Sequence, residues 1–556
     1  MIIRHLIVGM VEQALEQARA QGLLPQGSPI DVAVEHPQSP EHGDFATNVP
    51  LRLARSLRVN PLEIAQRLVP LIPPNEAVAR IWSEGPGFIN FSLRDTWLAS
   101  RVESVLQENE SFGNVDLGKG ERVQVEFVSV NPTGPIHVGH ARGAVLGDAL
   151  SRVLSVAGYD VTREYYVNDA GSQMEAFYNS LYVRYQQVLG RQAEMPQGGY
   201  VGDYMVALAR EIAEEEGERF LDMETGEAVR QIGHMGLERM LSRIMGDLER
   251  LRVHFDVWFR ENTLHEEGQL RRSLDMLGQG NHLMEREGAT WFVSTALGED
   301  KDNVLVRGSG LPTYFAADVA YHYNKFVERG FSKVIDVWGA DHQGHVSRMK
   351  AAIGALGIDP QRLIIIISQM VTLKRGEQQI RASKRTGELV TLPELLDEVG
   401  PDPCRYFFLA RSPGSQMDFD LELAKKESEE NPVYYVQYAH ARIASILRLA
   451  QERQIDYSNG DVSLLTHPAE LSLIRRMVML PELVESMAIS LEPHHLPHYA
   501  QELATAFHWF YQQCRVVSSD PGDEAITRAR LKLVAAARIA LGRCLHLMGM
   551  QAPEQM

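Results

Sequence analysis

Hydrophobic positions between residues 123 and 167 follow a pattern that predicts a strand, a helix and a second strand. The first strand is expected at residues 123–130, a β-branched apolar run that reads VQVEFVSV. The second strand reads DVTREYYV. The helix between them is expected to end at Gly158 and has apolar side chains on one face, at Leu146, Leu150, Val153, Leu154 and Ala157. This order predicts two parallel strands joined by a helix.

The same alternation returns later in the chain. Residues 332–341 (SKVIDVWGAD) and 362–371 (RLIIIISQMV) have the pattern of strands, with a helix through Ala355 between them. A charged and mostly helical segment, about residues 175–285, separates the two halves and is expected to be an insertion. Two such halves predict a Rossmann-like doubly wound parallel sheet, in which ligands bind at the carboxyl ends of the strands.

The two ends of the chain have different patterns. Residues 1–115 mix helical periodicity with strand-like stretches that read IDVAVEH and PGFINFSL, which predicts an N-terminal α+β domain. The sheet domain is expected at residues 116–420, and residues 421–556 predict an all-α helical bundle. The expected fold class is therefore multidomain α/β, and 556 residues are too many for a single core.

Composition and charge exclude several classes of function. The chain has 55 basic and 73 acidic residues, and this balance argues against a protein that coats nucleic acid by bulk electrostatics, although it allows local basic patches. Its three cysteines form no CxxC pair, so we expect neither a disulfide framework nor a thiolate zinc site. No signal peptide or membrane helix is predicted, and a cytoplasmic location is expected.

Two histidines, His137 and His140, stand at the start of the first predicted helix, in the stretch NPTGPIHVGH. A helix N-terminus presents free N–H groups and a partial positive charge, and Gly139 lets a ligand approach the backbone. Zinc binding is an alternative, but no cysteine is near, the HExxH spacing is absent and no third ligand is identified. Incidental turn and cap histidines are the other alternative. We favour a site for the phosphates of a nucleotide.

A short basic segment could hold the far end of such a triphosphate. Residues 381–387 read RASKRTG and place Arg381, Lys384 and Arg385 close together after a predicted strand. By itself this segment would be as well explained by a solvated surface loop. Its combination with the histidine pair favours a phosphate site.

The pair of motifs HVGH and RASKR resembles the HIGH and KMSKS signatures of class I aminoacyl-tRNA synthetases. The wider stretch from EFVSVNPTGPIHVGHARG to REYYVNDAG resembles the arginyl-tRNA synthetase family. So do EHGDFATNVPLRLA, GPGFINFSL, GPDPCRYFFLARSP and the closing LHLMGMQAPEQM, so the resemblance covers nearly the whole chain. It implies an arginine–tRNA ligase that activates arginine with ATP and transfers it to the 3′ end of tRNA(Arg).

The resemblance also implies roles for residues that match the motifs. His137, His140 and Lys384 would be catalytic, and ATP would be bound by these three together with Gly139, Ser383 and Asp341 of the GAD segment. The basic segment departs from the family pattern, because it has Arg381, Ala382 and Arg385 where KMSKS has lysine, methionine and serine. Some family members have a lysine where this chain has Gly134. Lys384 is therefore expected to bind the β- and γ-phosphates alone.

Arginine selection requires carboxylates that face a planar guanidinium. Tyr314 and Asp318 are four residues apart, which places them on one face if the stretch is helical. A cap and an ordinary surface acid are the alternative. The resemblance implies arginine binding by both, and by Glu126, Asn131 and Glu261 as well.

Contacts with tRNA are expected at both ends of the chain. Aromatic and basic side chains on one predicted helix of the bundle suit an unpaired RNA loop, although each tyrosine could equally belong to the core. They are Tyr434, Tyr435, Tyr438, Arg442 and Arg448. The resemblance places Phe88 and Asn90 at the corner of the tRNA. Mg²⁺ is expected to accompany ATP, held mainly by phosphates and water.

Zinc bound by the protein is not expected, and the chain is expected to be a monomer. Two other functions remain open at this point. One is a different class I synthetase or a nucleotidylyltransferase. The other is a tRNA-binding paralogue that has lost activation.

Overall fold

The N-terminal part is an antiparallel sheet covered by helices. The structure is a computed structural model that describes residues 2–24, 31–380 and 390–556. The sheet has the strand order β1-β2-β4-β3. Its elements are α1 (Ile3–Ala20), β1 (Val34–Glu35), β2 (Phe45–Thr47), α2 (Val49–Leu57), α3 (Pro61–Leu68), β3 (Val78–Glu84) and β4 (Phe88–Leu93). The strand predicted at IDVAVEH is shorter than expected, since only Val34–Glu35 is paired.

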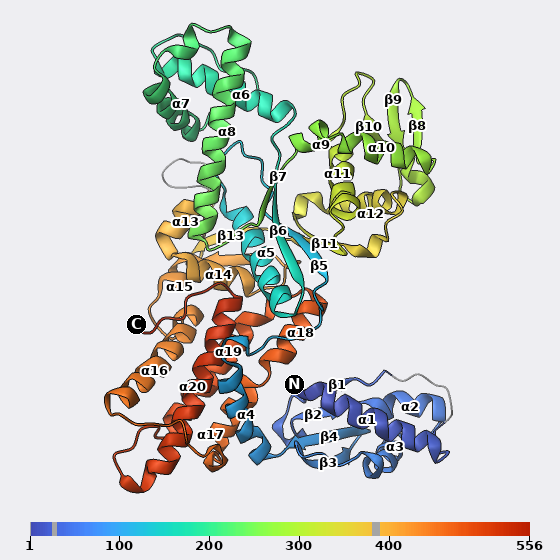
Figure 1. Cartoon of the computed structure of the whole chain (residues 1–556), viewed down its shortest axis with the longest axis vertical. Coiled ribbons are helices and arrows are strands. Elements are labelled where there is room, and N and C mark those ends of the chain that lie inside the picture. Colours follow the sequence, from blue (N-terminus) through green and yellow to red (C-terminus); the bar gives the residue numbers. More distant parts are fainter. Residues whose placement is uncertain (1, 25–30, 381–389) are drawn as a thin grey trace.

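Helix α4 (Asp95–Glu108) connects this part to the helical bundle at the other end of the chain. It packs against α17 (Pro468–Met477) and α20 (Glu524–Leu547) rather than on the N-terminal sheet (Figure 1). Its buried side chains, including Trp97 and Leu98, explain this position because they face the bundle. A helix that the sequence assigned to residues 1–115 thus lies in space with the C-terminal bundle.

The centre of the molecule is a five-stranded parallel sheet with the order β12-β11-β5-β6-β7. The reversal of strand order beside β5 is the switch point of a doubly wound fold. The predicted fold class, a multidomain α/β chain with this sheet between an α+β domain and a helical bundle, is confirmed. The strands and two of their helices are β5 (Arg122–Glu126), α5 (Val138–Val156), β6 (Asp160–Val167), β7 (Val257–Arg260), β11 (Lys333–Gly339), α12 (Val346–Ala355) and β12 (Leu363–Ser368).

Strand β5 is shorter than the prediction of 123–130. It ends at Glu126, and the chain then turns, with positive φ angles of 70° at Val128 and 41° at Ser129. A Cβ on Gly147 of α5 would lie 2.2 Å from the Phe127 ring, so this glycine allows the turn to pack closely on the helix. The apolar residues after β5 therefore belong to a turn rather than to a strand, with Phe127 buried and Val128 and Val130 partly buried.

The predicted helical insertion, about residues 175–285, differs from the structure. Strand β7 lies within that range and is the edge strand of the central sheet. The helical part before it comprises α6 (Ser172–Val188), α7 (Asp203–Glu216) and α8 (Thr225–Arg250). The part after it comprises α9 (Asn262–Glu266), α10 (Gln269–Gln279), β8 (Leu283–Arg286), β9 (Ala289–Phe292), β10 (Asn303–Val306) and α11 (Tyr314–Tyr323). Four residues of strand are too few to show in the sequence pattern.

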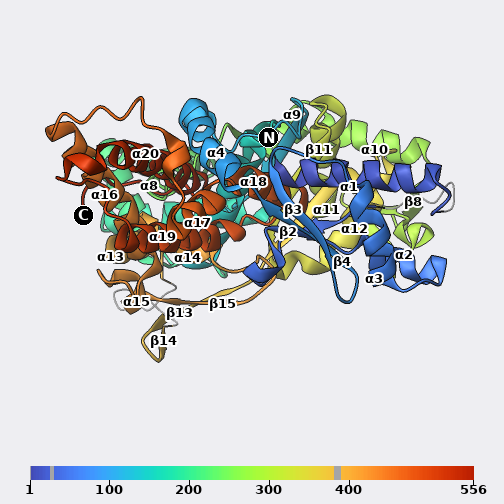
Figure 2. The ribbon, with the colours of Figure 1, turned by 90° about the horizontal axis from the view of Figure 1, so that it is seen from below.

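A further three-stranded sheet has the order β14-β13-β15. Figure 2 shows β14 at the end of the projection that it forms with β13. Strand β15 pairs in parallel with β13. Its elements and the helices beside it are β13 (Val371–Arg375), β14 (Gln378–Ile380), α13 (Leu392–Val399), α14 (Pro401–Leu409) and β15 (Met417–Asp420).

Residues 421–556 are helical, as predicted. The helices are α15 (Leu421–Lys425), α16 (Pro432–Glu452), α17, α18 (Leu480–Ser490), α19 (His495–Gln513) and α20. Arg405 of α14 is buried and joins this bundle to the central domain, since it pairs with Asp148 of α5 and donates to the carbonyl oxygens of Leu251 and Met548. Within the described part of the chain, no helix has the length and apolar character needed to cross a membrane.

Candidate active site

The two motif histidines lie side by side at the carboxyl edge of the central sheet. His137 caps α5 in an extended conformation, and its ring centroid is 3.7 Å from that of His140. Burial lowers the pKa of both imidazoles, and the neighbouring His137 charge helps to bring the pKa of His140 to about 4. Both rings are therefore neutral near pH 7. A neutral imidazole can still donate one hydrogen bond, which suits a phosphate oxygen.

The residues that follow the basic motif are hydrogen-bonded to the start of α5, beside the histidine pair. The Val138 N–H donates to the carbonyl oxygen of Val390 over 3.0 Å, and the Leu392 N–H donates to Ile136 over 2.8 Å. Thr391 pairs with His137 in an isolated β-bridge and caps α13 through a capping box. Ser383 and Lys384, together with Arg381, Ala382 and Arg385, lie outside the described residues.

Asp341 follows β11, the neighbour of β5, and lies near the histidine pair. It belongs to a 3₁₀ turn at Ala340–His345, and its side chain is 80% exposed. Its charge raises the pKa of His140 against the larger effect of burial. A Cβ on Gly139 would contact only the His137 ring, so the backbone of Gly139 is open on its other sides. The structure thus brings together four of the predicted ATP-site residues, His137, Gly139, His140 and Asp341, with Val390 and Thr391 beside them.

Two carboxylates, the buried Glu261 and the partly buried Asp318, stand at the same edge of the sheet. Glu261 follows β7 and is 5% exposed, and Asp318 lies on α11. Burial raises the pKa of Glu261 to about 7, against a hydrogen bond from Tyr166, and the charge of Asp318 adds to the rise. Burial also raises the pKa of Asp318. Neither carboxylate forms an ion pair with any residue that the structure describes, so the pair has room for a cation.

Tyr314 does not lie inside this acidic cluster. It is the first residue of α11, its side chain is at the rim with 48% of the residue exposed, and its hydroxyl would be 3.6 Å from a Cβ on Gly171. Tyr166 of β6 is the partly buried tyrosine that bonds to Glu261, and the sequence prediction missed it. The sequence pattern placed Tyr166 in a strand of the central sheet, but it did not show that this strand, β6, pairs with β7.

Glu126 is part of a buried charge network beneath the site. Lys325 donates to Glu126 over 2.6 Å and to Asp336 over 2.9 Å, and His322 contacts Asp336 over 2.9 Å. The Ser129 hydroxyl donates to the second oxygen of Glu126 over 2.9 Å. Burial alone would raise the pKa of Asp336, but Lys325 and His322 hold it below its usual value. Lys325 was missed because YHYNKFVERG reads as an exposed helix end.

Asn131 lies in the exposed turn before the histidines. Its side-chain amide donates to Gln173 of α6 over 2.6 Å. In the same turn, the hydroxyl of Tyr204 on α7 donates to the Thr133 carbonyl oxygen over 2.8 Å. The helical segment α6–α8 therefore holds the turn that leads into α5.

The RNA candidates on α16 form a half-buried stack. Tyr434 and Tyr438 stack with centroids 5.8 Å apart, and Arg442 donates to the Tyr438 hydroxyl over 2.6 Å. The Arg442 guanidinium also lies 4.6 Å from the Tyr438 ring centroid and 5.0 Å from that of Tyr511. The side chain of each tyrosine is thus partly buried in the bundle and partly exposed to solvent. Tyr435 packs on His508, and Arg448 donates to the Glu554 carbonyl oxygen.

The two N-terminal candidates differ in exposure. Phe88 is half-buried at the start of β4. Asn90 is 2% exposed and donates to Glu84 over 2.6 Å. The prediction that Asn90 meets RNA directly does not fit this burial, because its amide is already used inside the sheet. His42 and Trp82 also bond to Glu84, so Asn90 helps to order this carboxylate.

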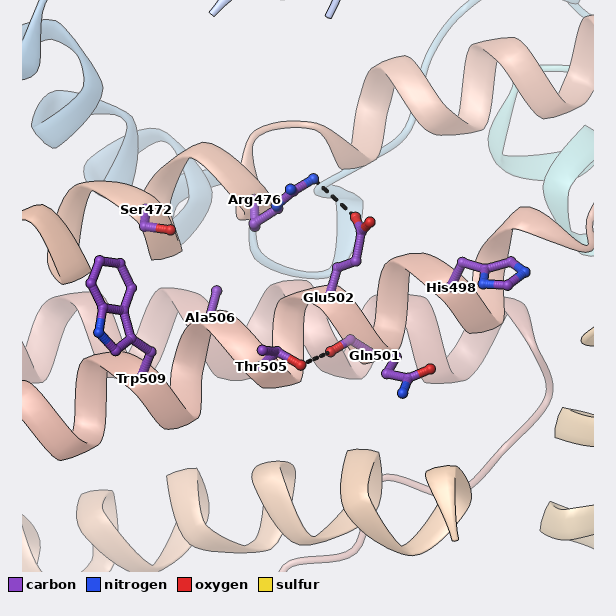
Figure 3. Close-up of a pocket in the computed structure, with 8 residues that line it drawn as sticks. All are labelled: Ser472, Arg476, His498, Gln501, Glu502, Thr505, Ala506 and Trp509. Atoms are coloured by element: carbon purple, nitrogen blue, oxygen red, sulfur yellow. Dashed lines mark hydrogen bonds and ion pairs between the residues drawn. The ribbon is translucent and has the colours of Figure 1, made fainter. Parts of the chain in front are cut away.

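Two surface hollows lie away from the sheet edge. One, of about 490 Å³, lies along α17 and α19, and Figure 3 shows Trp509 at one end and His498 at the other. The second, of about 600 Å³, continues from it to the N-terminal sheet. Their arginines are paired, Arg476 with Glu502 over 2.9 Å and Arg475 with Asp44 over 2.6 Å. The hollows therefore do not present free positive charge.

The described residues also bring Glu492, His494 and His495 together in the bundle, with one ligand atom of each within 4.8 Å of the others. Glu492 lies before α19, and His495 is its first residue. All three side chains are partly exposed. The expectation that the protein binds no zinc stays a prediction.

Comparisons with known proteins cover the whole chain. Three family models match: the arginyl tRNA synthetase N-terminal domain at residues 5–93, the catalytic domain of class I (R) tRNA synthetases at 101–403, and the DALR anticodon binding domain at 436–556. The arginine–tRNA ligase of Dehalococcoides mccartyi is 56% identical over 100% of this chain and 99% of its own length. That of Heliobacterium modesticaldum is 48% identical over 100% and 99%.

A solved structure agrees with the fold. The arginyl-tRNA synthetase of Thermus thermophilus superposes with a TM-score of 0.78 at 23% identity, over 100% of both chains. With the sheet edge, the histidine pair and the acidic pair in place, these matches show that the chain belongs to the arginyl-tRNA synthetase family of class I synthetases.

Proposed function

We propose that this arginine–tRNA ligase activates L-arginine with ATP at the carboxyl edge of the five-stranded sheet and then charges tRNA(Arg) there. The observation that carries this assignment of the site is the pair Glu261 and Asp318, two acids with raised pKa that form no ion pair with any described residue. A guanidinium supplies the missing charge and presents donors in a planar fork. The alternative, a tRNA-binding paralogue without activation, would have no need of this cluster.

In the first step, an oxygen of the arginine carboxylate attacks the α-phosphorus of ATP. A P–O bond forms to give arginyl-adenylate, and the bond to the pyrophosphate oxygen breaks. No protein nucleophile is required, so the enzyme acts by positioning and by stabilising charge on the departing pyrophosphate. In the second step, a hydroxyl of the terminal ribose of the tRNA attacks the activated carbonyl, and AMP leaves.

His137 and His140 are the proposed donors to the phosphate oxygens. They are neutral at pH 7 and sit at the N-terminus of α5, where free N–H groups add positive potential. Gly139 leaves space for the nucleotide, and Asp341 would accept from the ribose hydroxyls. Mg²⁺ would accompany ATP and balance the charge of its phosphates, with ligands mainly from phosphate and water.

Ser383 and Lys384 are proposed for the β- and γ-phosphates. Val390, bonded to Val138 beside the histidines, follows Lys384 by six residues. This short separation in sequence from a residue bonded beside the histidines supports the assignment.

Glu261 and Asp318 are proposed to bind the guanidinium, with Tyr166 orienting Glu261. Tyr314, at the rim, would cover the substrate side chain rather than meet its charged end. Asn131 is proposed for the α-amino end of arginine. Glu126 is proposed to support it from below, since Lys325 and Ser129 already use both of its oxygens.

The tRNA is proposed to contact both ends of the chain. Tyr434, Tyr438 and Arg442 offer ring faces and a cation to unpaired anticodon bases. Phe88 is the N-terminal candidate. The chain would act as a monomer in the cytoplasm, where tRNA is charged.

Pyrophosphate exchange with each amino acid in turn, with and without tRNA(Arg), tests the proposal. Arginine alone should drive exchange, and Glu261→Gln should abolish it at low arginine while leaving the ATP KM within about threefold. Exchange driven by another amino acid would contradict the arginine site. Absence of exchange under both conditions would support the inactive paralogue.

A further inference from the structure

A single carboxylate, Asp402, joins three separate segments of the chain. It lies in the first turn of α14, and its side chain is 13% exposed. One of its oxygens accepts from the Arg252 guanidinium and from the Gln551 N–H, the latter over 3.1 Å. The other oxygen accepts from the side-chain amide of Gln437 over 2.9 Å. Helix α14 itself packs against α5 of the central domain and against α16 and α19 of the bundle (Figure 1).

Arg252 is the partner from the central domain. It follows α8 in a left-handed conformation, with a φ angle of 61°, and begins the turn that leads to β7. Its guanidinium also donates to the Gly549 carbonyl oxygen over 3.3 Å, and its own carbonyl oxygen accepts from Arg405 over 3.2 Å. The stretch that continues through β7 to Glu261 is therefore anchored at Arg252.

Gln437 is the partner from the bundle. It lies on α16 between Tyr434 and Tyr438, the two stacked tyrosines proposed to contact unpaired RNA bases. Its amide donates to the Gln551 carbonyl oxygen over 3.1 Å as well as to Asp402. The RNA surface proposed on α16 is therefore bonded to α14 within one helical turn of its tyrosines.

Gln551, the third partner, belongs to a segment that lies along α16. Two residues of the helix donate to this segment further on, His440 to the Pro553 carbonyl oxygen over 2.9 Å and Arg448 to that of Glu554 over 3.1 Å. Residues 549–554 thus form a strap over α16, and its first part is fixed at the junction with α14.

The other charged group of α14 has different partners. Arg405 is buried and holds α14 on the central domain through Asp148 of α5. Among the described residues, none of its hydrogen-bond partners lies on α16. Asp402 therefore supplies the polar link between the central domain and α16, and Arg405 does not.

We propose that Asp402 is a positioning residue that fixes the orientation of α16 relative to the central sheet, so that a tRNA held at Tyr438 delivers its 3′ end to the arginyl-adenylate. This inference rests on the contact proposed above between α16 and the anticodon loop. A carboxylate suits the role because it accepts several bonds at once and pairs strongly with a guanidinium.

The distance between the two ends of a tRNA explains the effect on rate. The 3′ end lies far from the anticodon, so a small rotation of α16 at the junction displaces the 3′ end by a larger amount. A displacement of about 1 Å at a reacting group can lower a rate about 10²-fold. The sites for ATP and arginine lie within the central domain and should be affected little.

Asp402→Ala tests the proposal in steady-state aminoacylation. It should lower kcat at saturating tRNA(Arg) about tenfold, with the tRNA KM within about threefold, because the RNA surface of α16 is still present. The ATP and arginine KM values should stay within about twofold. Asp402→Asn keeps one acceptor oxygen and should recover part of the loss. Gln437→Met leaves the pair with Arg252 intact, removes the bond from α16, and should also lower kcat.

Glu470→Gln is the matched control for a general loss of stability. Glu470 is 1% exposed and pairs with Arg530 over 2.7 Å inside the bundle. The control should lower the thermal midpoint and keep kcat within about twofold. An equal fall of kcat in Glu470→Gln and Asp402→Ala would contradict a positioning role.

A double-mutant cycle with Tyr438→Ala examines the coupling directly. In the Tyr438→Ala background, Asp402→Ala should cost less than about threefold in kcat/KM for tRNA, because the contact that it orients is weakened. Full additivity of the two changes would refute the proposal. If Asp402→Ala does not fold, the same cycle with Gln437→Met decides.

The single variants tell this inference apart from the proposed function. A normal tRNA KM in both Tyr438→Ala and Arg442→Gln would contradict the RNA contact on α16, and this inference with it. A raised tRNA KM in those two variants, together with a normal kcat in Asp402→Ala, would contradict only the role of Asp402.

Discussion

The backbone N–H of Val138 donates to the carbonyl oxygen of Val390 over 3.0 Å, which joins two segments that are 252 positions apart. Val138 is the first residue of α5, between the two motif histidines, and Val390 directly follows the segment that contains Lys384. One of the N–H groups that a helix normally leaves free is thus used to hold Val390 beside the histidine pair.

Replacing Val138 with proline tests this bond without ending the helix. Proline is favoured at the first position of a helix, and His137 has the extended conformation that a following proline requires. Val138→Pro should raise the ATP KM about fivefold or more, because it removes one donor and leaves a carbonyl oxygen unpaired. Val138→Ala keeps the N–H and is the control. Equal ATP KM values in the two variants would argue against a role for the bond.

His140 should act as a neutral donor. The pKa of its imidazole is lowered to about 4, so the ring is unprotonated and uncharged when the reaction is assayed at pH 6–8. His140→Ala should lower the exchange rate about 10²-fold, as is typical when a donor to transition-state charge is removed. His140→Asn should retain more activity, because an amide also donates without charge. If a positive charge were needed instead, the kcat of His140→Lys would be higher than the kcat of His140→Asn.

Arginine binding should weaken as the pH falls. Without substrate, burial raises the pKa of Glu261 to about 7, so the group is ionised above that pH and neutral below it. A guanidinium needs the ionised form, and the arginine KM should therefore rise about tenfold per unit as the pH drops below 7. The ATP KM, measured over the same range, should not follow this trend. In Glu261→Gln, the arginine KM should be high and should lose most of this dependence.

Lys325 should be essential for stability. Its ammonium is fully buried between Glu126 and Asp336, at 2.6 and 2.9 Å. Lys325→Met would leave two buried acids without their cation, and it should lower the free energy of unfolding by about 3–5 kcal/mol. Lys426→Met removes an exposed partner of Glu430 and should leave the free energy of unfolding nearly unchanged. Denaturant melts of the two variants make the comparison, and similar losses would contradict a structural role for the network.

Replacing Tyr438 or Arg442 should weaken the binding of tRNA and leave the binding of ATP and arginine unchanged. Tyr438→Ala and Arg442→Gln should each raise the tRNA KM in aminoacylation by about tenfold, since stacking on an aromatic ring is worth roughly 1–3 kcal/mol per base. The ATP and arginine KM values at saturating tRNA should stay within about twofold. With a tRNA altered in its anticodon loop, the difference between variant and wild type should shrink. An unchanged difference would place these residues in the core of the bundle only.

Much of the fold was predictable from local pattern. The β5–α5–β6 and β11–α12–β12 units were predicted at nearly their observed positions, because a long apolar face in a helix and a β-branched run in a strand are local features. Strand β7 was hidden, since four residues between charged helices carry no clear period. The turn at Val128 was read as strand, because its residues are as apolar as those of β5.

The candidate site shows the same division. His137 and His140 stood out in the sequence through their motif, and Glu261 was named through the family resemblance. Tyr166, Lys325 and Asp402 did not stand out, because nothing in YHYNKFVERG marks an ammonium as buried and nothing in GPDPCRYF marks a carboxylate as a junction. Their roles depend on partners 11 to 199 positions away.

The amino-acid sequence by itself determined the class of fold, the family and the histidine pair, because short-range periodicity and motif spacing are written in consecutive residues. Only the tertiary structure decided which carboxylates lack a cation, which carboxylate joins α14 to α16, and that α4 belongs with the bundle. Burial and ionic pairing arise when distant segments exclude water from one another, and no local stretch of sequence contains that information.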